Sequence, residues 1–280
     1  MSKTEKITSR DNKKLKDARK TRDRKIPSKI FIEGSRLAEE ALRSSLKVVE
    51  AFVTKKFEKS ERGKVLRAAL EAKNAEIHEL SDDLFETIAD TSHPQGVALI
   101  CERPKAEKSD LESRIHLDAS GLPVVVFLKG TNNPSNLGAI LRTAEAAGAA
   151  GIIVSRDSAD VFSPKALRAA MGSSLRMPLW TGASFDEVML WAAERRLRTT
   201  AADVHGELSY LEVDWKKPRL LIFGSEATGL DERELHSLDE IISIPMTNDV
   251  ESLNLAVSSG VVLFEGLRSA TKPAASGSRA

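Results

Sequence analysis

The sequence predicts an α/β protein whose second half forms a mostly parallel β-sheet. Two runs, 124–127 and 220–223, contain only apolar residues and show no alternation with polar ones. Strands of this kind are buried on both faces, which is typical of a parallel sheet covered by helices. Apolar strands also alternate with helical patterns along most of the chain, as an α/β architecture requires.

The length of the chain, 280 residues, indicates two domains. Single hydrophobic cores stop growing at roughly 250 residues, and common domains have about 100–150. Composition divides the chain at a polar, unpatterned segment that begins near a proline and ends at a glycine. We therefore predict a smaller α/β domain at 1–102, a linker at 103–120, a larger domain at 121–270 and a disordered tail at 271–280.

The first 102 residues show a regular order of short strands and helices. Strands are predicted at 30–32, 48–53, 76–80 and 97–101, and helices up to about Lys20 and at 36–42, 60–73 and 82–89. Cys101 is the only cysteine and follows two apolar residues, so we expect a buried side chain rather than a reactive thiol. A single cysteine forms no internal disulfide, which suits a reducing cytoplasm.

The larger domain continues the alternation after the linker, in which a short helix at 109–115 is an alternative. Strands are predicted at 123–128, 151–155, 197–201, 219–223 and 241–244. Helices are predicted at 136–147, 164–171, 185–195, 231–235 and 251–267. The three tryptophans are more typical of a core than of a surface that stacks on bases.

Charge is distributed unevenly along the chain although its net value is only +1. Between Lys3 and Lys29 there are twelve lysines and arginines but four acids. Such a segment favours contact with the phosphates of a nucleic acid, although a solvated helix face has the same composition. No apolar run approaches the roughly 20 residues of a membrane span, and the N-terminus has no secretory-type apolar core. We expect a cytoplasmic protein without membrane contact.

Three polar segments, 133–142, 223–230 and 244–257, each follow a predicted strand and lead into a predicted helix. In an open α/β sheet, ligands bind at the carboxyl ends of the strands, where such segments lie. On propensity alone, Asn136 would be a helix cap and Arg142 a surface cation. Gly224 and Gly229 would let a ligand approach the backbone, but their spacing is neither that of a phosphate loop nor of a dinucleotide motif.

The third segment has a plain structural interpretation as well, in which Ser252 caps a helix and Leu253 is a core residue. Metal binding is not expected anywhere in the chain. The five histidines are scattered, and neither paired cysteines nor an H-E-x-x-H motif is present. The site in the larger domain is therefore predicted to contain no metal.

Together the three segments resemble, in order and content, motifs one, two and three of the SpoU (TrmH-like) RNA ribose 2′-O-methyltransferases of the SPOUT class. The resemblance implies a larger domain with a trefoil knot, a homodimer and S-adenosylmethionine as cofactor. Segments 31–34 and 94–97 more weakly resemble the N-terminal RNA-binding domain of many SpoU enzymes, which is itself similar to a ribosomal protein.

The same resemblance implies roles for individual residues. The implied catalytic residues are Asn136, Arg142, Glu226, Ser252 and Asn254. The implied cofactor-binding residues are Gly224, Gly229, Ile244, Met246 and Leu253. For Arg142 two roles stay open: a general base for the ribose hydroxyl, or a cation that holds phosphate and stabilises the developing oxyanion.

The implied function is S-adenosylmethionine-dependent methylation of a ribose 2′-hydroxyl in structured RNA. The separate N-terminal domain favours ribosomal RNA over transfer RNA, whose methylation is one alternative. A non-catalytic RNA-binding protein that retains the fold is another. The presence of Asn136, Arg142 and Asn254 favours the enzyme.

Overall fold

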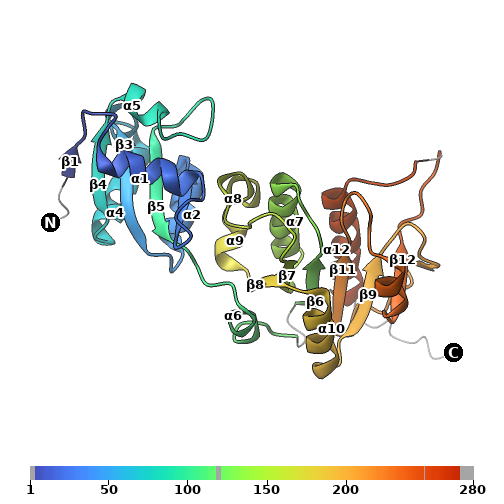
Figure 1. Cartoon of the computed structure of the whole chain (residues 1–280). Helices are drawn as coiled ribbons and strands as arrows, with labels where there is room; N and C mark the ends of the chain where they lie inside the picture. Colours follow the sequence, from blue (N-terminus) through green and yellow to red (C-terminus); the bar gives the residue numbers. More distant parts are fainter. Residues whose placement is uncertain (1–3, 118–120, 249, 272–280) are drawn as a thin grey trace. The chain divides into compact units, whose positions relative to one another are not determined.

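The computed structural model describes residues 4–117, 121–248 and 250–271 (Figure 1). They form two compact units, one made of residues up to Lys105 together with Asp160–Arg176, and one made of Ala106–Ala159 and the chain from Met177 onward. The predicted boundaries at 102 and 121 stay a prediction, and the predicted tail lies outside the described residues except for Thr271. Within the described ranges, no helix is long and apolar enough to cross a membrane.

The first unit contains a five-stranded sheet of mixed direction. Its strands are β1 (Thr4–Lys6), β2 (Lys29–Glu33), β3 (Val48–Thr54), β4 (Glu76–Leu80) and β5 (Val97–Glu102), in the order β1-β4-β3-β5-β2. β4 is parallel to β1 and β3, whereas β5 is antiparallel to β3 and β2. Four of these strands were predicted; β1 was not, because its three residues are polar and gain their partner 73 positions away, as in the pair Thr4–Ile77.

Helices cover both faces of this sheet. They are α1 (Lys13–Arg22), α2 (Ser35–Arg43), α3 (Lys55–Glu58), α4 (Glu61–Ala72) and α5 (Asp82–Glu86), to which the unit adds α8 (Pro164–Ala170) and α9 (Ser173–Arg176). One core cluster joins Leu15 of α1 to Phe52 and Phe85. Cys101 is fully buried, which confirms the predicted burial, and burial raises the pKa of its thiol.

Part of the positive charge of the N-terminal segment is used inside the unit. Arg19 and Arg22 donate hydrogen bonds to groups in the 87–89 segment. Lys14 Nζ lies 2.6 Å from a carboxylate oxygen of Glu76. Other bases are exposed and have no side-chain hydrogen bond or ion pair with any described residue; these include Arg10, Lys13 and Lys25.

The second unit contains a seven-stranded sheet in which every described strand pair is parallel. Its strands are β6 (Leu122–Leu128), β7 (Ala149–Ser155), β8 (Leu179–Ala183), β9 (Arg198–Ala202), β10 (Leu208–Ser209), β11 (Arg219–Phe223) and β12 (Glu240–Ser243). The order is β10-β12-β9-β11-β6-β7-β8. The predicted parallel sheet is confirmed, and β8 and β10 are additions to it.

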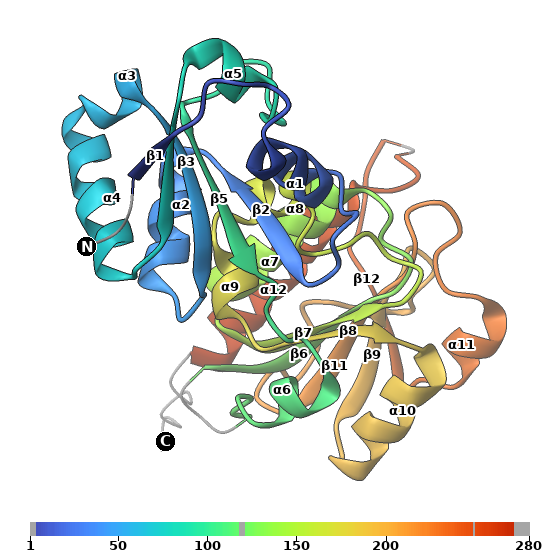
Figure 2. The ribbon, with the colours of Figure 1, turned by 60° about the vertical axis from the view of Figure 1, so that its left-hand side comes forward.

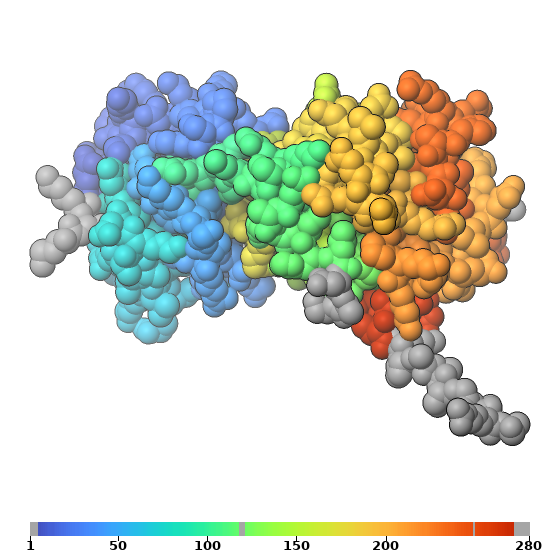
Figure 3. Space-filling model, turned by 90° about the horizontal axis from the view of Figure 1, so that it is seen from below, coloured from blue at the N-terminus to red at the C-terminus, as the bar shows by residue number. Residues whose placement is uncertain are grey.

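Helices lie on both faces of this sheet, with α6 and α10 on one side and α7 and α12 on the other (Figure 2). Their bounds are α6 (Lys108–Glu112), α7 (Pro134–Ala146), α10 (Phe185–Glu194), α11 (Glu232–His236) and α12 (Leu255–Thr271). The alternative of a short helix in the predicted linker is confirmed by α6, whose Leu111 is fully buried. In the space-filling view the residues around α6 lie against those of α10 (Figure 3), where Glu112 accepts a hydrogen bond from Trp191 Nε1.

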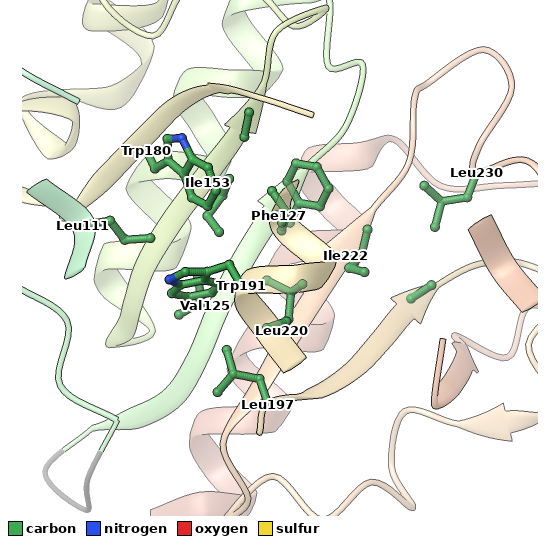
Figure 4. Packing of buried hydrophobic residues seen from close by; sticks show 14 residues of the cluster. Leu111, Val125, Phe127, Ile153, Trp180, Trp191, Leu197, Leu220, Ile222 and Leu230 are labelled. Atoms are coloured by element: carbon green, nitrogen blue, oxygen red, sulfur yellow. The ribbon is translucent and has the colours of Figure 1, made fainter. Parts of the chain in front are cut away.

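One core cluster of the second unit lies between the sheet and α10. Figure 4 shows Trp191 of α10 packed with Val125 of β6 and Leu220 of β11. Trp191 and Trp215 are fully buried and Trp180 is 7% exposed, so the predicted core role of the tryptophans is confirmed. This core contains residues of five neighbouring strands, β9, β11, β6, β7 and β8. The candidate site lies at the carboxyl ends of strands of the same sheet.

Candidate active site

The three polar segments singled out in the sequence meet at one edge of the parallel sheet. The first follows β6, the second follows β11 and the third follows β12. β11 pairs with β6 on one side and with β9 on the other, and β9 pairs with β12. Because parallel strands place their carboxyl ends at the same edge, this strand order brings the segments together.

Asn136 lies in the first turn of α7 and points at the other two segments. Its Nδ2 donates a hydrogen bond of 2.7 Å to Glu226 Oε1. Its Oδ1 lies 3.5 Å from the Nδ2 of Asn254, so three of the five predicted catalytic side chains form one continuous group. Asn133, not Asn136, caps the helix, since its side chain accepts from the backbone N–H of Ser135. The cap interpretation of Asn136 is therefore wrong, and its side chain is free for the site.

Asn254 has two structural roles at the beginning of α12. Its Oδ1 accepts hydrogen bonds from the backbone N–H groups of Ala256 and Val257, so it caps the helix. Its Nδ2 is thereby directed at Asn136. The helix begins at Leu255, four residues later than predicted, because this cap defines its first turn. Ser252, the cap expected from the pattern, is exposed and lies outside the helix.

Arg142, like Ser252, is a predicted catalytic residue that the structure does not bring into this hydrogen-bonded group. It lies on α7 six residues after Asn136, a rotation of about 240° around the helix axis. Its side chain is exposed and makes no hydrogen bond or ion pair with any residue that the structure describes. Within the described part of the chain, no side chain therefore holds the guanidinium.

The second segment forms a closed loop between Ser225 and Gly229. The backbone N–H of each residue donates to the carbonyl oxygen of the other, at 3.2 and 3.0 Å. Gly224 precedes this loop, and a Cβ on it would lie 2.5 Å from the carbonyl carbon of Gly229. The sequence explained this glycine by the approach of a ligand; the structure shows that the loop itself already requires it. Gly229 has a φ of +64°, which also favours glycine.

Two hollows that share five lining residues lie beside these segments. The larger, of about 660 Å³, is lined by 202–205, 223–230 and 252–255 with Glu232, Leu235 and Ser258. The smaller, here called the recess, has about 60 Å³ and is lined by Ala202, Asp203, Val204, Ile242, Ile244, Met246, Leu253 and Ser258. All five predicted cofactor-binding residues line one or both hollows. Glu226, Ser252 and Asn254 of the predicted catalytic set line the larger hollow.

The residues that sequence reasoning missed are those directly after β9, among them Asp203. They line both hollows, because β9 lies between β11 and β12. Asp203, directly after β9, could have been recognised as a site residue only if β9 had been known to lie beside β11. The local sequence pattern does not contain this strand order, because it is set by long-range pairing. The chemistry of the walls is uneven: the recess is mostly apolar, whereas the larger hollow contains hydroxyl, amide and carboxylate groups.

Comparison with known proteins assigns this architecture to a family. Residues 123–264 match the model of the SpoU rRNA Methylase family, and residues 10–99 match the MRM3-like substrate binding domain. The chain is 30% identical over 261 residues to the 23S rRNA (guanosine(2553)-2′-O)-methyltransferase RlmP of Bacillus subtilis, which covers 92% of this chain and 97% of that protein. An uncharacterised tRNA/rRNA methyltransferase of Synechocystis is 31% identical, covering 94% of this chain and 93% of the relative.

Solved structures give the same result across both units. The AdoMet-bound rRNA methyltransferase from Sinorhizobium meliloti matches with a TM-score of 0.80 and 28% identity, over 95% of this chain and 98% of that chain. The SpoU methyltransferase AviRb from Streptomyces viridochromogenes, in complex with AdoMet, matches with a TM-score of 0.79 and 27% identity, over 92% and 98% of the two chains. The chain therefore belongs to the SpoU rRNA methylase family.

Proposed function

We propose that this chain transfers a methyl group from S-adenosylmethionine to a ribose 2′-hydroxyl of ribosomal RNA. The observation that carries the proposal is the hydrogen-bonded group of Glu226, Asn136 and Asn254 beside the larger hollow. Membership of the SpoU family and the names of the relatives, which methylate 23S rRNA, support this choice of substrate. Transfer RNA is the alternative substrate.

The residues around the two hollows fit S-adenosylmethionine. Ile244, Met246 and Leu253 offer apolar surface for an adenine ring in the recess. Polar groups of the larger hollow surround the space for the amino-acid part. When bound, this cofactor supplies a methyl group already activated by its sulfonium. We therefore propose that the reaction needs neither a covalent enzyme intermediate nor a metal ion.

The tasks left to the protein are to place the ribose and to accommodate the loss of its proton, which in this proposal passes to solvent during the transfer. Glu226 fixes the amide of Asn136 by accepting from its Nδ2, and Asn254 is fixed by capping α12. Two amides held in this way can orient a ribose hydroxyl in line with the methyl group. Positioning of this kind converts a bimolecular step into an effectively unimolecular one and supplies a large share of the rate.

Arg142 is proposed to act across a homodimer interface. It has no partner among the described residues of its own chain and does not contact Asn136. α12, which packs against α7, exposes Val257 and Phe264 by 53% and 49%, and these positions lie seven residues apart on one helix face. A second copy that covers this face would bring its own α7 close to the site. There the guanidinium would hold an RNA phosphate and stabilise the developing oxyanion.

Three further features are proposed from family membership. The segment between β11 and α12 is threaded as a trefoil knot, and the threaded segment supplies Ile244, Met246 and Leu253 to the cofactor. The first unit binds the RNA. This is consistent with its match to a substrate binding domain and with exposed cations that have no side-chain partner among the described residues, such as Arg10, Lys13 and Lys25. The protein acts in the cytoplasm, where its substrate RNA is found.

Arg142→Ala tests the function directly. The free energy of unfolding should change by no more than about 0.5 kcal/mol, as expected for a surface residue, because no contact with a described residue is lost. Methyl transfer from labelled cofactor to ribosomal RNA should fall by about two to four orders of magnitude. The assay uses ribosomal and transfer RNA from cells that lack the gene, followed by mapping of the methylated ribose. Absence of labelled ribose in both RNAs with the wild-type protein would contradict the proposal and favour a non-catalytic binding protein.

Mixed dimers test the place of Arg142. Arg142→Ala and Asn254→Ala chains should each be nearly inactive alone. If Arg142 acts across the interface, a mixed dimer contains one site with both residues intact, and activity returns on mixing. If Arg142 acts within its own chain, no site in a mixed dimer is complete. Persistent inactivity of verified mixed dimers would place Arg142 in the site of its own chain.

A further inference from the structure

We propose that Asp203 accepts hydrogen bonds from the ribose hydroxyls of the adenosyl group and so selects the cofactor. The inference rests on the proposed function, since it concerns the same cleft. It adds a side-chain contact to a site whose other assigned cofactor residues are glycine or apolar. Asp203 follows β9 directly and lines both the larger hollow and the recess.

The backbone holds the Asp203 carboxylate at the centre of the cleft. β9 lies between β11, which leads to the glycine loop, and β12, which leads to Ile244. The N–H of Asp203 donates to the carbonyl oxygen of Ile242 at 2.9 Å. Its Oδ1 accepts from the N–H of His205 at 2.9 Å, which fixes the orientation of the carboxylate. Its Oδ2 lies 3.5 Å from the point where a Cβ on Gly229 would stand, so this oxygen faces the glycine loop.

The chemistry of the two hollows indicates which part of the cofactor lies at Asp203. Adenine suits the apolar recess, and the amino-acid part suits the polar hollow, where Glu226 and Asn254 lie. The ribose joins these two parts, so it must lie where the hollows meet. The recess is smaller than an adenine ring, so Leu253, which is 37% exposed, and the flexible Met246 must move when the ring enters.

Five residues line both hollows: Ala202, Asp203, Val204, Leu253 and Ser258. Only Asp203 and Ser258 among them have polar side chains, and Ser258 Oγ already donates to the carbonyl oxygen of Asn254 at 3.3 Å. A carboxylate accepts several hydrogen bonds at once, which matches the two neighbouring hydroxyls of a ribose. Dinucleotide-binding α/β folds use an acid in the same way to bind the ribose.

The affinities for S-adenosylmethionine and S-adenosylhomocysteine, measured by calorimetry, test the assignment of Asp203 to the ribose. Asp203→Ala should weaken both ligands about 10- to 100-fold, because a hydrogen bond to a charged group is lost in each case. Glu207→Ala is the control, since this acid also follows β9 but is exposed and lines neither hollow, and the affinity of that variant should stay within about threefold of wild type. A loss confined to S-adenosylmethionine would overturn the ribose assignment, because only the sulfonium distinguishes the two ligands.

A ligand without the hydroxyls separates the contact from damage to the loop. Wild-type protein should bind 2′,3′-dideoxy-S-adenosylhomocysteine about as weakly as the Asp203→Ala variant binds the normal ligand. The variant should lose nothing further on the dideoxy ligand, whereas additive losses would overturn the proposal. If wild type binds neither normal ligand, the proposed function fails. If it binds both and Asp203→Ala binds equally well, only the inference about Asp203 fails.

Discussion

Gly224→Ala should damage the cofactor loop even before any ligand is bound. An added Cβ would lie 2.5 Å from the carbonyl carbon of Gly229, 2.8 Å from its oxygen and 2.7 Å from the backbone nitrogen of Leu230. Ordinary contacts of a Cβ begin near 3.4 Å. All three atoms belong to the backbone, so no side-chain rotation can relieve the overlap. The 225–229 loop must shift by most of an ångström.

The cost can be worked out in two ways. Overpacking of a tight site costs about 1–3 kcal/mol. Alternatively, the loop relaxes by breaking the two backbone hydrogen bonds between Ser225 and Gly229, each worth about 0.5–1.5 kcal/mol. Both routes give a loss of about 1–3 kcal/mol in the free energy of unfolding. For a domain of this size, each kcal/mol lost lowers the melting temperature by roughly 2–4 °C.

The assay is thermal unfolding with and without S-adenosylmethionine. Wild type should gain about 2.7 kcal/mol at a hundredfold excess over the dissociation constant, whereas ATP and NAD should give no shift. Gly224→Ala should melt lower and lose most of the gain. Gly260→Ala in α12 is the control, since its Cβ would meet only a methyl of Thr143 at 3.6 Å; alanine should stabilise that helix by about 0.5–1 kcal/mol. A Gly224→Ala protein with wild-type melting and affinity would refute the loop argument.

Three further predictions follow from contacts in the two units. Arg219→Ala should lower the free energy of unfolding by about 3–5 kcal/mol, measured by urea denaturation, because it removes a fully buried cation that binds Thr200 and Glu240. Burial raises the pKa of Glu50, but His78, Lys14 and Lys29 lower it, so that its net pKa lies below the ordinary range. The stability that ionised Glu50 contributes is present above the pKa of the unfolded state and is lost as pH falls through the pKa of the folded state. Glu50→Gln should therefore flatten that part of the acid-unfolding curve. Replacing Arg10, Lys13 and Lys25 by alanine should weaken RNA binding and make its salt dependence shallower, whereas an unchanged slope would mean that these bases are only solvated.

Much of the second unit could be predicted because its strands are locally unambiguous. Continuous apolar runs such as Leu220–Phe223 are strands only in a sheet covered on both faces, and β6 and β11 lie where the pattern placed them. β8 was missed because Gly182 and the preceding Pro178 are typical of a turn, and its conformation depends on pairing with β7. Pairing partners far apart in sequence leave no local pattern.

The candidate site divides in the same way. Resemblance identified the residues, and strand order explains why Asn136, Glu226 and Asn254 meet although they come from three segments. Local propensity gave a wrong result at Asn136, because the helix cap that the pattern assigned to Asn136 is formed by Asn133. At Gly224 the structure adds a reason, since backbone atoms of its own loop also exclude a side chain. The approach of a ligand to this glycine stays a prediction.

Asp203 and Arg142 mark the two limits of prediction from a single chain. Asp203 follows β9, a short strand whose neighbours in the sheet are β11 and β12. Its place in the cleft therefore depends on a strand order that no local pattern contains. Arg142 has a well-defined place on α7, yet it has no partner among the described residues that would explain a catalytic role. We propose that a second chain and an RNA phosphate supply its partners. The mixed-dimer experiment therefore addresses a part of the site that neither the sequence nor the fold of one chain contains.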